Sequence, residues 1–271
     1  NNLEGWGGPN PDSWYIRQIA LQKKILKRMR EYGIEPVLPG YCGMVPHNAK
    51  EKLGLNVSDP GTWCGYRRPA FLQPSDPRFE EISSLYYKEL EKLYGKADFY
   101  SMDPFHEGGN TAGVDLDAAG KAVMKAMKKA NPKAVWVAQA WQANPRPKMI
   151  ENLKAGDLLI LDLTSECRPQ WGDSTSEWYR KNGYGQHDWI YCMLLNYGGN
   201  VGLHGKMDNV IDNFYLAKAD PHAGSTLKGV GMTPEGIENN PVMYELVMEL
   251  PWRAERFTKE EWLKEYVKAR Y

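Results

Sequence analysis

Short apolar runs alternate along this chain with segments of helical periodicity, and this alternation limits the fold more than any other feature. The runs that we expect to form strands cover residues 34–41, 97–102, 134–140, 158–163, 189–195 and 227–232. Apolar spacing predicts helices over residues 13–32, 77–94, 116–130, 148–153, 207–219 and 240–250. Strands apolar on both faces and joined by helices indicate a parallel sheet covered by helices, either doubly wound or closed into a barrel.

Helix boundaries and one long connection are predicted from turn and capping residues. We expect Asp12 or Ser13 to cap the first helix, Asp76 the second and Asp115 the third. Residues 42–74 show no regular pattern and predict a long loop, of a length that is usually functional or disordered in compact domains.

The residues at the ends of the predicted strands favour a barrel over a doubly wound sheet. A Gly-x-Gly-x-x-Gly motif does not follow the first strand, and the chain contains no phosphate-binding P-loop motif. Instead, side chains suited to chemistry come after nearly every strand: Glu107, Asn110, Trp141, Gln142, Glu166, Arg168, Asn196, Tyr197 and Glu235. Such a distribution is typical of a (β/α)8 TIM-type barrel, whose active site lies at the carboxyl ends of the strands. We interpret the six strands as strands 3 to 8, with two N-terminal strands outside this stretch.

Composition excludes some partners and favours others. Lys plus Arg equals Asp plus Glu at 34 each, so no net charge attracts nucleic acid or an anionic membrane. No apolar run approaches the roughly 20 residues that span a bilayer. The four cysteines form no Cys-x-x-Cys pair, so neither a metal site nor a disulfide framework is indicated. Ten Trp and 16 Tyr against 6 Phe favour rings with a polar group, which suit carbohydrate faces.

Two glutamates lie where a glycosidase would place its acids. Glu107 and Glu166 each come just after a buried strand, so we expect both at the carboxyl ends of barrel strands. Glycoside hydrolysis needs one carboxyl group to protonate the leaving oxygen and a second to attack or to activate water. The alternative is that both are solvated loop acids or neighbours of a helix cap.

Six sequence blocks, taken together, resemble a known family. They cover residues 3–9, 36–39, 103–107, 161–166, 196–200 and 231–236. In order and spacing they resemble the α-N-acetylglucosaminidases of glycoside hydrolase family 89, over nearly the whole chain. His106 departs from the lysosomal member, which has Asn before the acid/base.

The resemblance implies a domain plan and a set of partners. Residues 1–238 would be a partial (β/α)8 catalytic barrel, and residues 239–271 would begin a helical C-terminal domain. The partners implied are a glycan with terminal α-linked N-acetylglucosamine, together with the missing N-terminal strands and the helical domain of the same protein. We expect no cofactor, no nucleic acid and no membrane span, and a secreted, periplasmic or lysosomal location.

The resemblance also implies roles for individual residues. Glu107 matches the general acid/base and Glu166 the nucleophile. Trp6, Trp63 and Trp141 match aromatic residues that line the family's sugar site. By their positions after predicted strands, His106, Asn196, Tyr197 and Glu235 are further candidates for sugar binding, the alternative for Glu235 being a structural hydrogen bond at the barrel rim. Trp136 lies inside its predicted strand and is assigned to the core. His106 is not followed by the second His of a zinc-binding helix, so we expect no metal.

The expected activity is that of a retaining, exo-acting glycoside hydrolase that releases terminal α-linked N-acetylglucosamine through a covalent glycosyl-enzyme. Two alternatives remain at this point. One is another retaining barrel glycosidase, and the other is a non-catalytic carbohydrate-binding protein.

Overall fold

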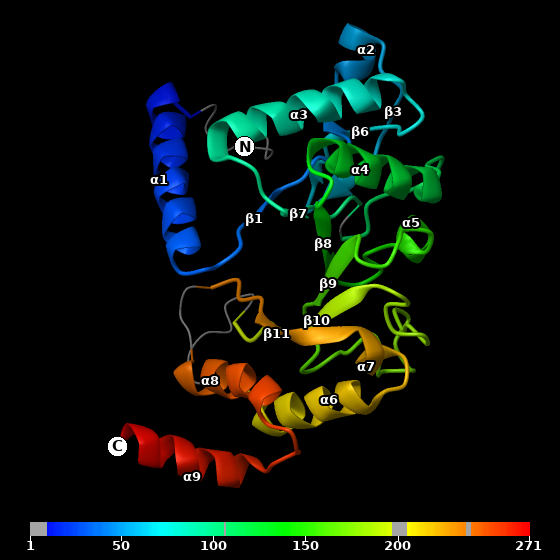
Figure 1. The fold of residues 1–271 in the computed structure, drawn as a ribbon. Coiled ribbons are helices and arrows are strands. Elements are labelled where there is room, and N and C mark those ends of the chain that lie inside the picture. The colour runs from blue at the N-terminus through cyan, green and yellow to red at the C-terminus, as the bar shows by residue number, and fades with distance from the viewer. Residues whose placement is uncertain (1–9, 106, 197–204, 237–239) are drawn as a thin grey trace. The chain divides into compact units, whose positions relative to one another are not determined.

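The computed structural model describes residues 10–105, 107–196, 205–236 and 240–271 (Figure 1). The chain divides into two compact units. The first comprises Asn1–Ala138 with Ala143–Leu153, and the second comprises Gln139–Gln142 with Lys154–Tyr271. Strand β8 therefore runs from the first unit into the second.

The predicted strands form a six-stranded sheet in the order β1-β7-β8-β9-β10-β11. Their bounds are β1 Val37–Pro39, β7 Phe99–Ser101, β8 Val135–Ala140, β9 Leu158–Asp162, β10 Asp188–Met193 and β11 Leu227–Met232. In the first unit β7 pairs in parallel with β1 and β8, and in the second β10 pairs in parallel with β9 and β11. The sequential order of parallel strands confirms the prediction of strands linked by helices, as in a barrel.

Helices of the first unit match their predictions closely, and they are α1 Asp12–Glu31, α3 Arg78–Tyr94, α4 Leu116–Ala130 and α5 Pro147–Ile150. Asp115 caps α4 as predicted, because its side chain accepts from the backbone N–H of Ala118. The prediction for α1 was wrong: Pro11 occupies the cap position, no side chain bonds there, and Asp12 already belongs to the first turn. Trp136 is buried as expected and donates its indole N–H to the Met102 carbonyl.

The predicted loop over residues 42–74 contains regular structure and was wrong in that respect. It holds β2 Met44–Val45, α2 Ala49–Leu53, β3 Val57–Ser58, β4 Thr62–Trp63, β5 Tyr66–Arg67 and β6 Ala70–Leu72. Strands β2, β6 and β3 form a small antiparallel sheet, and β4 and β5 form a hairpin. Strands of two or three residues are too short for an alternating pattern to be recognised.

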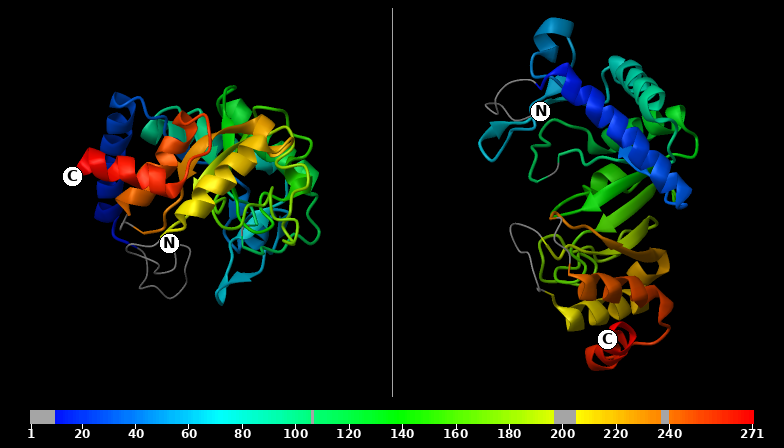
Figure 2. Two further views of the ribbon diagram at one scale, coloured as in Figure 1. Left: turned by 90° about the horizontal axis from the view of Figure 1, so that it is seen from below. Right: turned by 90° about the vertical axis from the view of Figure 1, so that its left-hand side faces the viewer.

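The second unit packs helices beside its three strands. These are α6 Met207–Ala219, α7 Ala223–Thr226, α8 Pro241–Glu249, the short helix η1 Leu250–Trp252 and α9 Lys259–Arg270. Helix α8 contacts both β11 and α6, and Figures 1 and 2 show α6 and α8 side by side along these strands. Thr258 and Glu261 form a reciprocal capping box that starts α9.

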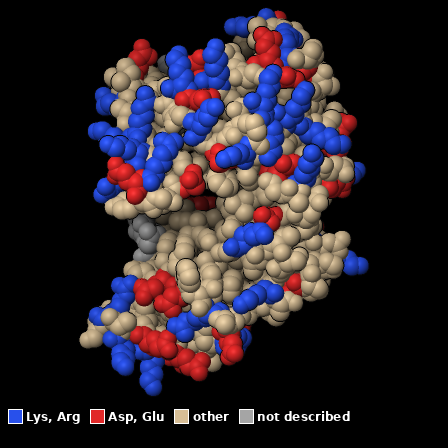
Figure 3. All heavy atoms as spheres, in the orientation of Figure 1, with Lys and Arg blue, Asp and Glu red and all other residues tan. Residues whose placement is uncertain are grey.

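Charges of both signs are mixed on the face of the molecule that Figure 3 shows. Figure 3 shows Lys and Arg side chains interspersed with Asp and Glu, consistent with the equal numbers in the sequence. Within the described parts of the chain, no helix combines the length and apolar character needed to cross a bilayer. In those same parts no group of three His, Cys, Asp or Glu side chains is placed to hold a metal ion.

Candidate active site

Glu107 lies in a tight turn just after β7, at the carboxyl end of the strand, as predicted. Its backbone has a positive φ of 50°, and Phe105 has one of 60°. Such left-handed conformations are costly for residues other than glycine and persist where the surroundings enforce them. Two hydrogen bonds brace the turn: Arg68 Nη2 donates to the Glu107 carbonyl at 2.9 Å, and Asn110 N donates to the Pro60 carbonyl at 2.9 Å.

The β4–β5 hairpin brings Trp63 to the Glu107 side chain. The indole N–H of Trp63 donates to Glu107 Oε2. Arg68 also donates from Nε to the Thr62 carbonyl at 3.2 Å, so one arginine ties the hairpin to the turn that carries the glutamate. The predicted site residues Glu107 and Trp63 are thus brought together.

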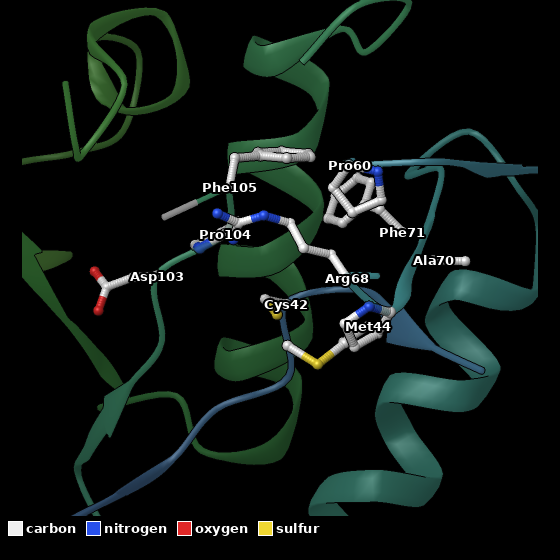
Figure 4. A pocket seen from close by; sticks show the side chains of 10 residues that line it. Cys42, Met44, Pro60, Arg68, Ala70, Phe71, Asp103, Pro104 and Phe105 are labelled. Atoms are coloured by element: carbon white, nitrogen blue, oxygen red, sulfur yellow. The ribbon is translucent and has the colours of Figure 1, made fainter. Parts of the chain in front are cut away.

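A cavity of about 190 Å³ lies beside this turn. Its lining is mostly apolar and comprises Cys42, Met44, Pro60, Arg68, Pro69, Ala70, Phe71, Asp103, Pro104 and Phe105. Figure 4 shows the Arg68 side chain extending beneath Phe105 toward Pro104. The segment 103–105 that leads to Glu107 therefore forms one wall of the cavity.

In the second unit, Glu166 is a buried acid at the carboxyl end of β9. Its side chain is 7% exposed, and Oε1 accepts from the backbone N–H of Leu194 at 3.2 Å. Among the described residues Oε2 has no hydrogen-bond partner. Burial raises the pKa of the Glu166 carboxyl to about 7, against the opposing effect of backbone N–H groups.

Asn196 and Glu235 lie together at the ends of β10 and β11. Asn196 is buried, and its carbonyl accepts from the backbone N–H groups of Glu235 at 3.1 Å and Gly236 at 3.3 Å. The Asn196 side-chain amide also donates to the Gly236 carbonyl at 3.2 Å. Asn196 therefore fixes the turn that presents Glu235, whose side chain is exposed.

Trp141 comes after β8 and is half-buried, beside Gln142, whose φ is 54°. The Gln142 carbonyl accepts from Gln170 Nε2 at 2.7 Å. Three further predicted site residues, Trp6, His106 and Tyr197, lie outside the described residues.

Sequence reasoning missed the bracing residues Arg68 and Gln170. Arg68 stands in an aromatic and basic stretch next to Trp63, which was a visible signal. No sequence signal pointed to Gln170, because its role depends on the contact that its loop makes with Gln142 after folding.

Comparison with known proteins places this geometry in a family. A sequence model described as the α-N-acetylglucosaminidase TIM-barrel domain matches residues 1–254. The chain belongs to this family. Human α-N-acetylglucosaminidase is 37% identical over 268 residues, which cover 93% of this chain and 35% of the human protein.

Solved structures of the α-N-acetylglucosaminidase family agree with that assignment. A family 89 glycoside hydrolase from Clostridium perfringens, in complex with 2-acetamido-1,2-dideoxynojirimycin, is 33% identical with a TM-score of 0.86. The match covers 100% of this chain and 30% of that chain. A variant of a C. perfringens enzyme with two glutamates replaced by glutamine, bound to its substrate GlcNAc-α-1,4-galactose, is 32% identical with a TM-score of 0.86 over the same shares.

The match to these relatives is partial in length. The chain spans about a third of the curated and solved relatives it matches. The barrel of this family has more distant likenesses as well. A family 20 exo-β-N-acetylglucosaminidase from Vibrio harveyi is 13% identical, with a TM-score of 0.54 over 92% of this chain, and shares the fold alone.

Proposed function

We propose that the protein to which this chain belongs hydrolyses terminal α-linked N-acetylglucosamine with retention of configuration. The observation that carries the proposal is membership of the α-N-acetylglucosaminidase family along 254 residues of the chain, including Glu107 and its turn. The C. perfringens relative bound to GlcNAc-α-1,4-galactose supports a glycan of this class as substrate. A secreted, periplasmic or lysosomal location stays a prediction.

Glu107 fits the role of general acid/base. It is half-buried at the carboxyl end of β7 and meets the Trp63 indole, an aromatic ring suited to a sugar face. In the first step its carboxyl group would protonate the glycosidic oxygen as the bond to the aglycone breaks. In the second step the resulting carboxylate would take a proton from the attacking water.

The nucleophile must be ionised and open to the sugar. The environment of Glu166 does not favour the role of nucleophile that the resemblance implies for it. Burial raises the pKa of Glu166 to about 7, and one of its oxygens is held by Leu194 N–H. Glu235 is exposed after β11, and the carbonyl of Asn196 fixes its backbone. Glu235 is thus open to a ligand, whereas Glu166 is enclosed and burial disfavours its ionised form, so these environments favour Glu235 as the attacking group.

The C. perfringens variant with two glutamates replaced by glutamine also supports Glu235 as the nucleophile. Replacing glutamate by glutamine keeps the side chain's shape and removes its ability to attack or to transfer a proton. The two replaced glutamates are separated along that chain by twice the separation of Glu107 and Glu166. Their separation is close to that of Glu107 and Glu235. We therefore propose Glu235 as the nucleophile, in place of Glu166, and assign Glu166 to holding the segment before Asn196.

Azide rescue in the full-length enzyme tests these roles. An activated aryl α-N-acetylglucosaminide would be given to Glu235→Ala, Glu166→Ala and Glu107→Ala, with azide present. The nucleophile variant should yield the azide of inverted configuration and the acid/base variant the azide of retained configuration, as read by NMR. An inverted product from Glu166→Ala would restore Glu166 to the nucleophile's role. Full activity of both Glu107→Ala and Glu235→Ala would contradict the proposed mechanism.

A further inference from the structure

A buried glutamine links the loop after β9 to the turn after β8. Gln170 is 4% exposed, and its Nε2 donates to the Gln142 carbonyl at 2.7 Å. Its Oε1 accepts from Arg180 Nε at 2.7 Å, and its carbonyl accepts from Arg180 N at 2.8 Å. Arg180, Gln170 and Gln142 thus form one continuous chain of hydrogen bonds.

The direction of this chain is determined by its arginine. A guanidinium can only donate, so the side-chain oxygen of Gln170 must face Arg180 and its NH2 group must face the Gln142 carbonyl. Arg180 is held in turn, because its Cζ lies 5.3 Å from the centre of the Tyr184 ring. Burial lowers the pKa of Arg180, and the neighbouring Tyr184 and Asp162 side chains oppose that shift.

The turn that receives this hydrogen bond needs support. Gln142 has a φ of 54°, in the left-handed region that residues other than glycine adopt only at an energetic cost. Trp141 directly precedes it, so a hydrogen bond that holds the backbone of Gln142 also restrains the backbone that carries the Trp141 indole. Removing the donor from Gln170 would leave the Gln142 carbonyl without this partner and release the turn.

We infer that Gln170 is a positioning residue that holds the Trp141–Gln142 turn and thereby places the Trp141 indole for the sugar. The inference rests on the proposed function, since it takes the sugar to bind against Trp141. Gln170 touches neither sugar nor reacting atoms in this role. It acts through the turn, and the indole determines how tightly the N-acetylglucosamine ring is bound.

Gln170→Glu in the full-length enzyme is the discriminating variant. The carboxylate keeps the size of the side chain and its bond to Arg180, but it presents an acceptor to the Gln142 carbonyl. On an aryl α-N-acetylglucosaminide we expect KM to rise roughly fivefold or more, with kcat changed less than about twofold. Hydrogen–deuterium exchange over residues 139–145 should increase, whether or not substrate is present.

A double-mutant cycle with Trp141→Ala separates positioning from general damage. If Gln170 acts through Trp141, adding Gln170→Glu to Trp141→Ala should leave KM unchanged within roughly 1.5-fold. Gln186→Glu, which makes the same change at an exposed glutamine of the same segment, is the control and should match wild type.

Three results would overturn the inference. These are an undiminished KM effect of Gln170→Glu in the Trp141→Ala background, unchanged exchange over residues 139–145, and a Trp141→Ala variant with wild-type KM. A wild-type enzyme inactive on α-N-acetylglucosaminides would instead refute the proposed function. The exchange result would still report on the turn, so the two failures are distinguishable.

Discussion

Trp63 contributes two distinct properties at the position where it meets Glu107. Its ring offers an apolar face of the kind that stacks on sugars, and its N–H donates to Oε2 of Glu107. The residue is 43% exposed, so the ring retains a free face for a ligand. Replacing Trp63 by Phe keeps an aromatic ring but removes the N–H. The substitution therefore tests the support of Glu107 apart from sugar binding.

We expect Trp63→Phe in the full-length enzyme to lower kcat/KM roughly fivefold, because the Glu107 side chain loses the hydrogen bond that holds it in place, and such a bond contributes about 0.5–1.5 kcal/mol. Steady-state kinetics on an aryl α-N-acetylglucosaminide would measure this loss. Trp63→Ala, which removes the ring as well, should lose more. Trp252→Phe is the control, since Trp252 is 87% exposed and lies outside the hairpin and the turn that carry Trp63 and Glu107. A Trp63→Phe enzyme within twofold of wild type would show that the indole N–H does not matter.

The burial of Glu166 predicts a pH-dependent stability. Burial raises its pKa from 4.5 to about 7, so between these values the native state keeps a proton that the unfolded state has lost. Stability therefore falls as pH rises through this window and is level above it. Glu166→Gln removes the effect, and its stability relative to wild type should improve between pH 4.5 and pH 7 by at most about 3 kcal/mol.

Thermal denaturation of the full-length protein at several pH values would measure the difference between Glu166→Gln and wild type. Glu177→Gln, at an exposed position of the same segment, should show no such trend. A stability difference for Glu166→Gln that does not change with pH would mean that the carboxyl group is not desolvated.

At the scale of elements, local signals determined most boundaries. Helix α6 begins and ends where the sequence predicts, and strand β11 does too, because each has a clear apolar pattern and distinct flanking residues. The small strands between Met44 and Leu72 could not be predicted, since their pairing depends on contacts between residues distant in sequence. The same limit applies to the site. Its acids were visible in the sequence, but the bracing by Arg68 and the burial of Glu166 arise only on folding.

The cap of α4 can be tested against a matched position in α1. Asp115→Ala should lower the free energy of unfolding by about 1 kcal/mol, because the Ala118 N–H loses its partner. Asp12→Ala is the control, since no side-chain cap bond exists at the start of α1. Denaturant titration of the full-length protein would measure both. Equal effects of the two substitutions would contradict the cap assignment.

On the scale of the whole protein, the first unit presents an apolar helix face that needs a cover. Leu21 and Ile25, one turn apart on α1, are 50% and 42% exposed, and Trp14, two turns before Leu21 on the same face, is 39% exposed. Strand β1 lies at one end of the strand order, so one of its edges is unpaired within the described residues. Exposed apolar surface of this kind marks interaction sites. We propose that other barrel segments of the same protein cover this face, because the chain spans only a third of its relatives' length. The expectation that a helical domain begins at residue 239 also stays a prediction.

This proposal predicts how α1 responds to charge in the full-length protein. Leu21→Glu and Ile25→Glu should each lower the melting temperature by several degrees, because a carboxylate would be buried against an apolar partner without compensation. Lys23→Glu introduces the same side chain on the opposite side of the helix and should have little effect, since Lys23 is exposed on the polar face. Differential scanning calorimetry would measure all three. If Leu21→Glu and Ile25→Glu melt like Lys23→Glu, the apolar face of α1 is in water in the whole protein, and the proposed cover is wrong.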